Sequence, residues 1–240
     1  MTTDELNNHS THDRIIKPLT LIIIWGLILE FPVRYFLSPD PWIHSADHWY
    51  FKQPARVLIE LGFVLAALFP FFVVKALKPL LSVHWTKNNL LFLSLGVTGS
   101  ILIFTVQQWE EIQAIQLGNL SQYVPVWFIT GLLIGIGQEI TFRGLIYTGV
   151  DKKYGTKAAI IISTLCFVFG SVHSARMYTY FINGYIIETF LLLAIFALSG
   201  LFFVWLRIKT KNIIIPAVVH GIGNAITWAT FVVVELHAAT

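Results

Sequence analysis

Apolar runs of about 20 residues recur along this chain, and they constrain its fold more than any other feature. A helix needs about 20 mostly apolar residues to cross the hydrocarbon core of a bilayer. Of the 240 residues, 56% are hydrophobic and only 12% are charged, whereas about a quarter of the residues of a soluble domain are charged. We therefore expect an all-α polytopic membrane protein, folded as a single membrane domain over residues 1–240.

Seven spans are predicted, and the charges that flank them sort by side. The spans cover residues 18–37, 57–77, 89–108, 123–149, 157–175, 180–206 and 212–235. Every second connection is rich in lysine and arginine. The others carry Asp40 and Asp47, then Glu110 and Glu111, then Arg176. The positive-inside rule then predicts a cytoplasmic N-terminus, with residues 1–16 as a polar cytoplasmic tail. We expect a multi-pass protein of the cytoplasmic (inner) membrane. Its expected partner is the lipid bilayer, and no binding to nucleic acid is expected.

The connection 38–53 is rich in aromatic residues: Trp42, Trp49, Tyr50 and Phe51. Such residues fit an interfacial anchor. They also fit a lip over a lateral entrance for a substrate.

Three polar signatures interrupt the apolar spans. They are Gln138-Glu139-x-x-x-Arg143, Phe169-x-x-x-His173 and His220-x-x-x-Asn224. Polar and ionisable groups inside a membrane are costly and are usually functional. Their recurrence on three separate spans predicts one buried polar site built from three helices.

The spacing within each signature is that of one helix face. Glu139 and Arg143 are four residues apart, so they are expected to form an ion pair. The plain alternative is a packing helix stabilised by that pair. His220 and Asn224 repeat the spacing, and both can donate hydrogen bonds to an oxyanion. Residue counting places Glu139 and His173 at similar depth and His220 about two turns shallower, so counting alone leaves their convergence open.

Together these side chains fit the hydrolysis of an acyl bond. A carboxylate and a histidine can hold and deprotonate a water molecule, while a His/Asn pair stabilises the tetrahedral oxyanion. No cofactor is expected. A divalent metal such as Zn²⁺ held by histidine and glutamate is the weaker interpretation, because the H-E-x-x-H signature is absent from the sequence.

The three signatures resemble those of the CPBP (Abi) family of intramembrane proteases, which includes the type II CAAX prenyl endopeptidases. The family pattern is Glu-Glu-x-x-x-Arg, Phe-x-x-x-His and His-x-x-x-Asn/Asp, and the matching stretches here read QEITFRG, FGSVH and HGIGN. The resemblance covers a catalytic core over about 123–230. It implies that position 138 and His173 activate the water, that His220 and Asn224 form the oxyanion hole, and that Glu139 and Arg143 support them.

This chain departs from the family pattern at Gln138. An amide keeps the shape and hydrogen bonding of glutamate but cannot take up a proton. Three explanations stay open: Glu139 acts as the base, the protein is a non-catalytic relative that binds a peptide or partner, or Gln138 replaces a natural glutamate.

The sequence thus predicts a CPBP-type intramembrane endopeptidase, of glutamic or metallo type, that acts on peptides or proteins in or at the membrane. The alternatives are a catalytically inactive pseudoprotease with a binding or regulatory role and a small polytopic transporter. The transporter interpretation rests on charged residues in or near the spans, namely Glu30, Arg34, Glu60 and Glu188. Helix-end snorkelling or pairing explains Glu30 and Arg34 without transport.

Overall fold

The computed structural model describes residues 18–37, 56–75, 77–82 and 85–237, and these ranges are almost wholly helical, with no strand among them. Six helices are long and apolar enough to cross a membrane, and a bent pair of helices supplies a seventh candidate span. The prediction of an all-α polytopic membrane protein is confirmed. The tail over 1–16 and the aromatic connection 38–53 lie outside the described residues.

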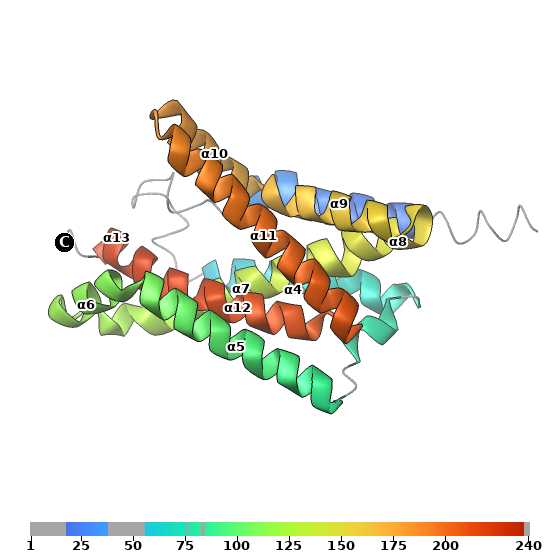
Figure 1. Ribbon diagram of the computed structural model, residues 1–240, viewed down its shortest axis with the longest axis horizontal. Coiled ribbons are helices and arrows are strands. Elements are labelled where there is room, and N and C mark those ends of the chain that lie inside the picture. Colours follow the sequence, from blue (N-terminus) through green and yellow to red (C-terminus); the bar gives the residue numbers. More distant parts are fainter. Residues whose placement is uncertain (1–17, 38–55, 76, 83–84, 238–240) are drawn as a thin grey trace, which may run out of the picture.

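From α4 onward the described helices follow one another with short connections (Figure 1). The first helix (Pro18–Leu37) contains the π-helical turn η1 (Leu29–Val33) and ends in α2 (Arg34–Leu37). The others, in chain order, are α4 (Arg56–Val73), η2 (Lys78–Leu81), α5 (Lys87–Gln107), α6 (Trp109–Leu117), η3 (Ser121–Tyr123), α7 (Val124–Glu139), η4 (Ile140–Ile146), α8 (Tyr147–Tyr154), α9 (Thr156–Val168), α10 (Ser171–Ile182), α11 (Ile186–Thr210), α12 (Ile214–Thr227), η5 (Trp228–Val232) and α13 (Val233–His237).

The fifth span differs from its prediction. A single helix over 157–175 is wrong, because α9 ends at Val168 and α10 leaves at an angle of 56°. Gly170 separates the two helices with ψ of 154°, an extended value that an α-helix does not accommodate. The predicted fourth span also continues further, since η3, α7, η4 and α8 form one element over Ser121–Tyr154.

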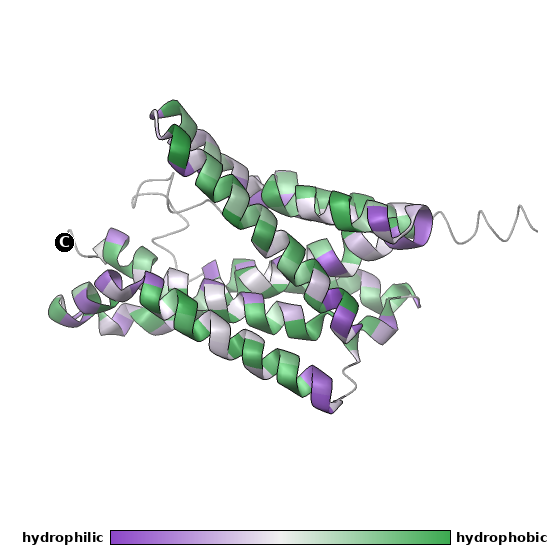
Figure 2. Cartoon of the chain, in the orientation of Figure 1, coloured by the Kyte–Doolittle hydropathy of each residue, from purple (hydrophilic) through white to green (hydrophobic). Residues whose placement is uncertain are grey.

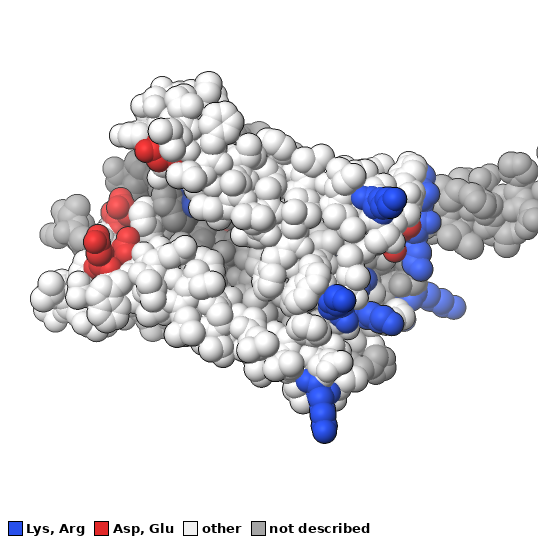
Figure 3. Space-filling view, viewed as in Figure 1, with Lys and Arg blue, Asp and Glu red and all other residues white. Residues whose placement is uncertain are grey.

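Hydropathy and charge are distributed as a membrane requires. Apolar residues dominate the long helices and polar residues gather toward their ends (Figure 2). Lysine and arginine collect at one end of the molecule, where α5 begins and α8 and α11 end, and the acidic residues visible in this view lie mainly at the other end (Figure 3). The charged connections therefore sort to two sides. That the basic side faces the cytoplasm remains a prediction from the positive-inside rule.

Glycines bring α12 into close contact with α7 and α5. A Cβ atom at Gly135 of α7 would lie 2.8 Å from the Cα atom of Gly221, and one at Gly131 would lie 2.5 Å from the carbonyl oxygen of Asn224. On the other side of α12, a Cβ at Gly96 would lie 2.6 Å from a methyl group of Val219. Small residues allow such backbone approach between membrane helices. The helix that carries His220 and Asn224 is thus fixed against its neighbours.

We predict opposite effects for two glycine-to-alanine substitutions. Gly135→Ala should lower the unfolding midpoint in detergent, because its Cβ meets backbone atoms that cannot move aside, and overpacking costs about 1–3 kcal/mol. Gly62→Ala on α4 is the matched control, since a Cβ there meets nothing within 4 Å. Alanine should stabilise that helix by about 0.5–1 kcal/mol. Equal shifts at both positions would contradict the close crossing of α7 and α12.

Candidate active site

A buried carboxylate joins α7 to α12. Glu139 is the last residue of α7 and is fully buried. Its Oε1 atom accepts hydrogen bonds from Nη1 of Arg143 at 3.0 Å and from Nδ1 of His220 at 2.8 Å. The pair with Arg143 is the one that the four-residue spacing predicts. The contact with His220 brings together two signatures whose convergence residue counting left open.

Arg143 extends this contact to α11. It lies in the π-helical segment η4, and its Nη2 atom donates to the carbonyl oxygen of Gly200 at 2.9 Å. Its guanidinium group also lies 4.5 Å from the centroid of the Phe167 ring, a cation–π contact. The buried cation is therefore in contact with a carboxylate, a carbonyl and an aromatic face, and these contacts lower the cost of a charge inside a membrane.

The break after α9 determines the state of His173. A helix end leaves its last carbonyl groups without intrahelical partners. The carbonyl of Phe167 lies in this last turn and is 2.7 Å from Nδ1 of His173. A carbonyl oxygen only accepts, so Nδ1 carries the proton and Nε2 of the neutral ring keeps its lone pair. The interruption at Gly170 thus fixes the tautomer of His173.

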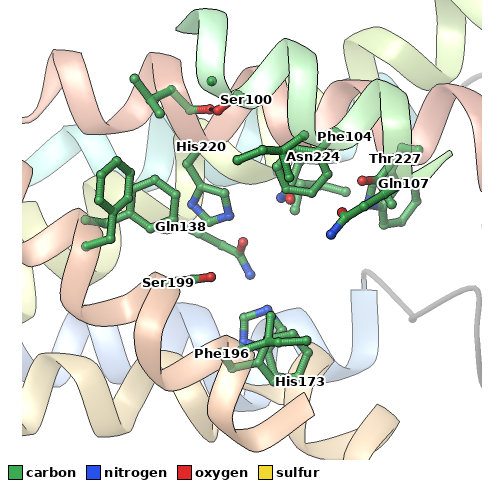
Figure 4. A pocket seen from close by; sticks show the side chains of 18 of the residues that line it. Ser100, Phe104, Gln107, Gln138, His173, Phe196, Ser199, His220, Asn224 and Thr227 are labelled. Carbon is green, nitrogen blue, oxygen red and sulfur yellow. Dashed lines mark hydrogen bonds between the residues drawn. The ribbon is translucent and has the colours of Figure 1, made fainter. Parts of the chain in front are cut away.

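One face of α11 supports both histidines. The His173 ring stacks on Phe196 with 4.1 Å between centroids, and the His220 ring stacks on Phe203 with 4.6 Å between centroids. Positions 196, 199 and 203 follow the i, i+3, i+7 pattern of one helix face. Ser199 accordingly lies between the two aromatic supports, and its side chain points into the space between His173 and His220 (Figure 4).

These side chains line a cavity of about 700 Å³ between α5, α7, α11 and α12. Gln138, His173, His220 and Asn224 all contribute to its wall, together with Ser199 and aromatic residues of α5 and α11. The space-filling view shows this face hollowed between α11 and α5 (Figure 3). Glu139 and Arg143 are fully buried and lie behind the wall, where they contact His220 and α11 rather than the cavity.

The six residues predicted from the signatures therefore fall into two groups, with four on the cavity wall and two behind it. Phe169, the aromatic residue of the second signature, is half exposed, and the contact with His173 comes from Phe167 instead. Ser199, Phe196 and Phe203 were not among the site residues predicted from the sequence. Their i, i+3, i+7 spacing on an apolar span was a detectable signal, but aromatic residues at such positions are common in membrane helices.

The signatures contribute two imidazoles and two primary amides to the cavity wall. In the ranges that the structure describes, no group of three or more histidine, cysteine, aspartate or glutamate side chains could hold a metal ion. The arrangement offers a lone pair at Nε2 of His173 as a proton acceptor, the amide of Asn224 as a donor and the amide of Gln138 as a hydrogen-bonding partner for water. Proton transfer to the histidine and hydrogen bonding to an oxyanion are the chemistry that this wall supports.

Comparison with known proteins agrees with the signatures. The family model for type II CAAX prenyl endopeptidase Rce1-like proteins matches residues 120–226, which include all six predicted site residues. No curated protein and no solved structure matches the chain.

We predict that Arg143 stabilises the fold through Glu139. Arg143→Met should lower the free energy of unfolding in detergent by about 3–5 kcal/mol, because it leaves the buried carboxylate without its cationic partner. Replacing both partners, as in Glu139→Gln with Arg143→Met, should recover most of the loss. Lys152→Met, at an exposed position in the last turn of α8, is the control. A double variant as unstable as Arg143→Met alone would show that the ion pair is not the cause.

Proposed function

We propose that the chain is an intramembrane endopeptidase that hydrolyses peptide bonds of membrane-associated proteins or peptides. The match of residues 120–226 to the Rce1-like family model supports membership of the CPBP/CAAX protease family. The observation that carries this proposal is the presence of Gln138, His173, His220 and Asn224 on the wall of one cavity. The catalytic core is assigned to residues 123–230. The substrate reaches the core in or at the cytoplasmic membrane.

His173 is the proton acceptor in the proposed mechanism. Its Nδ1–H is engaged by the carbonyl of Phe167, so Nε2 is free to take a proton from water. Gln138 holds that water by hydrogen bonding, since an amide binds water without accepting its proton. The water oxygen then attacks the carbonyl carbon of the substrate as its proton passes to His173.

Asn224 and His220 stabilise the resulting oxyanion. The amide of Asn224 donates a hydrogen bond, and His220 donates from Nε2 when its ring carries both protons. Glu139 accepts from Nδ1 of His220 and so fixes the orientation of that ring. Collapse of the tetrahedral intermediate breaks the carbon–nitrogen bond. The leaving amine takes its proton from His173, which restores the neutral imidazole.

The structure favours an indirect role for Glu139. Glu139 does not line the cavity, and its Oε1 atom accepts hydrogen bonds from both His220 and Arg143. A carboxylate held in this way orients a histidine, as the acid of a catalytic triad does. We therefore assign the base to His173 and treat Glu139 as a positioning residue.

A second candidate function is a pseudoprotease that binds a membrane peptide without cleaving it. The observation that favours it is Gln138, because the family's water-activating glutamate is replaced by a group that cannot take up a proton. The binding cavity would be the same. Cleavage activity distinguishes the two functions.

We predict that purified protein in proteoliposomes cleaves members of a membrane-peptide library, detected by mass spectrometry. His173→Ala should reduce kcat by about 10²- to 10⁴-fold through loss of the base. Asn224→Ala should reduce it by about 10²- to 10³-fold through loss of an oxyanion donor. Gln138→Glu should raise kcat, because it adds a second proton acceptor beside the water.

Asn183→Ala is the matched control for the asparagine variant, since Asn183 is exposed at the end of α10. Proteolysis that survives both His173→Ala and His220→Ala would contradict the mechanism. Absence of cleavage by both the natural chain and Gln138→Glu, with peptide binding retained, would favour the pseudoprotease.

A further inference from the structure

A carboxylate from outside the family match contacts position 138. Glu30 lies on the first helix, 108 residues before Gln138, and its Oε1 atom is 3.4 Å from Nε2 of Gln138. The matching family segment begins at residue 120 and therefore does not include Glu30. Glu30 is only 1% exposed, so its carboxylate is buried in the protein interior.

The first helix holds Glu30 in place through its backbone. Glu30 lies in the π-helical turn η1, which also contains Pro32. The hydroxyl of Ser171 donates to the carbonyl oxygen of Glu30 at 2.9 Å. Since Ser171 begins α10, this bond ties the first helix to the helix that carries His173. π-Helical turns occur often at functional sites.

An arginine fixes the other oxygen of the carboxylate. Nε of Arg34 lies 3.2 Å from Oε2 of Glu30, and Nη1 of Arg34 lies 3.1 Å from Glu60 on α4. Arg34 also lies 4.3 Å from the centroid of the Phe63 ring. With Oε2 held by this network, Oε1 of Glu30 stays directed at Gln138.

This contact sets the orientation of the Gln138 amide. A carboxylate only accepts hydrogen bonds, so the end of the amide that faces Glu30 must be the NH₂ group. The opposite end, the carbonyl oxygen Oε1, is then left for the cavity that Gln138 lines. Figure 4 shows the amide of Gln138 directed into the space between His220 and His173. A flipped amide would place two acceptors against each other.

We propose that Glu30 is a positioning residue of the active site, which orients Gln138 so that its carbonyl oxygen accepts a hydrogen bond from the attacking water. The family motif has a carboxylate at position 138 itself. In this chain the carboxylate belongs to Glu30, which is hydrogen-bonded to position 138 from behind. This role rests on the proposed peptidase function. It explains how a site with glutamine at this position keeps an acidic group in contact with the residue that holds the water.

The contact has a consequence for Gln138→Glu. That substitution places two carboxylates beside each other, and such a pair cannot hold two negative charges without cost. The charged and titratable groups around Glu30 are Arg34, Glu60, Arg143, Cys166 and, after the substitution, position 138. The substitution adds only one titratable group, the carboxylate at position 138. A pH dependence of stability that appears with the substitution therefore reports on the contact between this carboxylate and Glu30.

The test compares four proteins: the natural chain, Glu30→Gln, Gln138→Glu and the swap that carries both substitutions. The first readout is the unfolding midpoint in detergent between about pH 5 and about pH 8. In Gln138→Glu the midpoint should fall relative to the natural chain as the pH rises, because both carboxylates ionise. In the swap only one carboxylate remains at this contact, and this additional pH dependence should disappear.

The second readout is kcat and KM for a peptide that the natural chain cleaves. Glu30→Gln should lower kcat by about 10- to 100-fold with little change in KM, because the amide of Gln138 is free to flip and the water is misplaced. The swap should restore kcat, since it puts the carboxylate at position 138 and the amide at position 30. Glu188→Gln, an exposed glutamate in the first turn of α11, is the matched control and should leave kcat unchanged.

Two results would overturn the proposal: unchanged kcat in Glu30→Gln, or the same pH dependence of stability in Gln138→Glu as in the natural chain. If no variant cleaves any peptide, the proposed peptidase function fails. The stability readout still decides in that case whether Glu30 and position 138 are in contact. A contact without cleavage would reduce Glu30 to a structural partner and would reject its role in positioning water.

Discussion

The structure depends on the buried carboxylate of Glu139. A carboxylate in hydrocarbon is costly unless cations and hydrogen-bond donors meet it. Here Arg143 meets it from the following helical turn and His220 from α12. Because Arg143 also donates to the carbonyl of Gly200 on α11, one acidic group fixes the positions of three helices relative to one another.

The site is a consequence of this arrangement. Once His220 is tied to Glu139, the other end of its ring faces the cavity, where Phe203 supports it by stacking. The interrupted span brings His173 to the same cavity, because the end of α9 leaves a carbonyl for its Nδ1 atom. Two histidines that are held at Nδ1 by different acceptors can have different roles, one as a base and one as a partner of the oxyanion. That division is the basis of the proposed peptidase.

Much of this architecture is predictable from the sequence, because long apolar runs and alternating charged connections constrain a membrane protein strongly. The pair of Glu139 and Arg143 follows from their spacing alone. The meeting of His220 with Glu139 does not, because residue counting ignores helix tilt and the glycine contacts that draw α12 against α7. The break in the fifth span before His173 was also missed, because Gly170 lies in an apolar stretch that is typical of one continuous helix. The role of Glu30 was undetectable, because its contact spans 108 residues.

The most direct test is solid-state NMR of the protein in lipid bilayers, with labelled histidine nitrogen and labelled glutamate side-chain carbon. The account predicts a protonated Nδ1 on His220 that is dipolar-coupled to the carboxyl carbon of Glu139, as the 2.8 Å separation of Nδ1 and Oε1 requires. The coupling should vanish in Glu139→Gln, because that variant has no labelled glutamate carboxyl carbon at position 139. Absence of this coupling in the natural chain would mean that the first and third signatures do not meet at Glu139, and the proposed active site would be wrong.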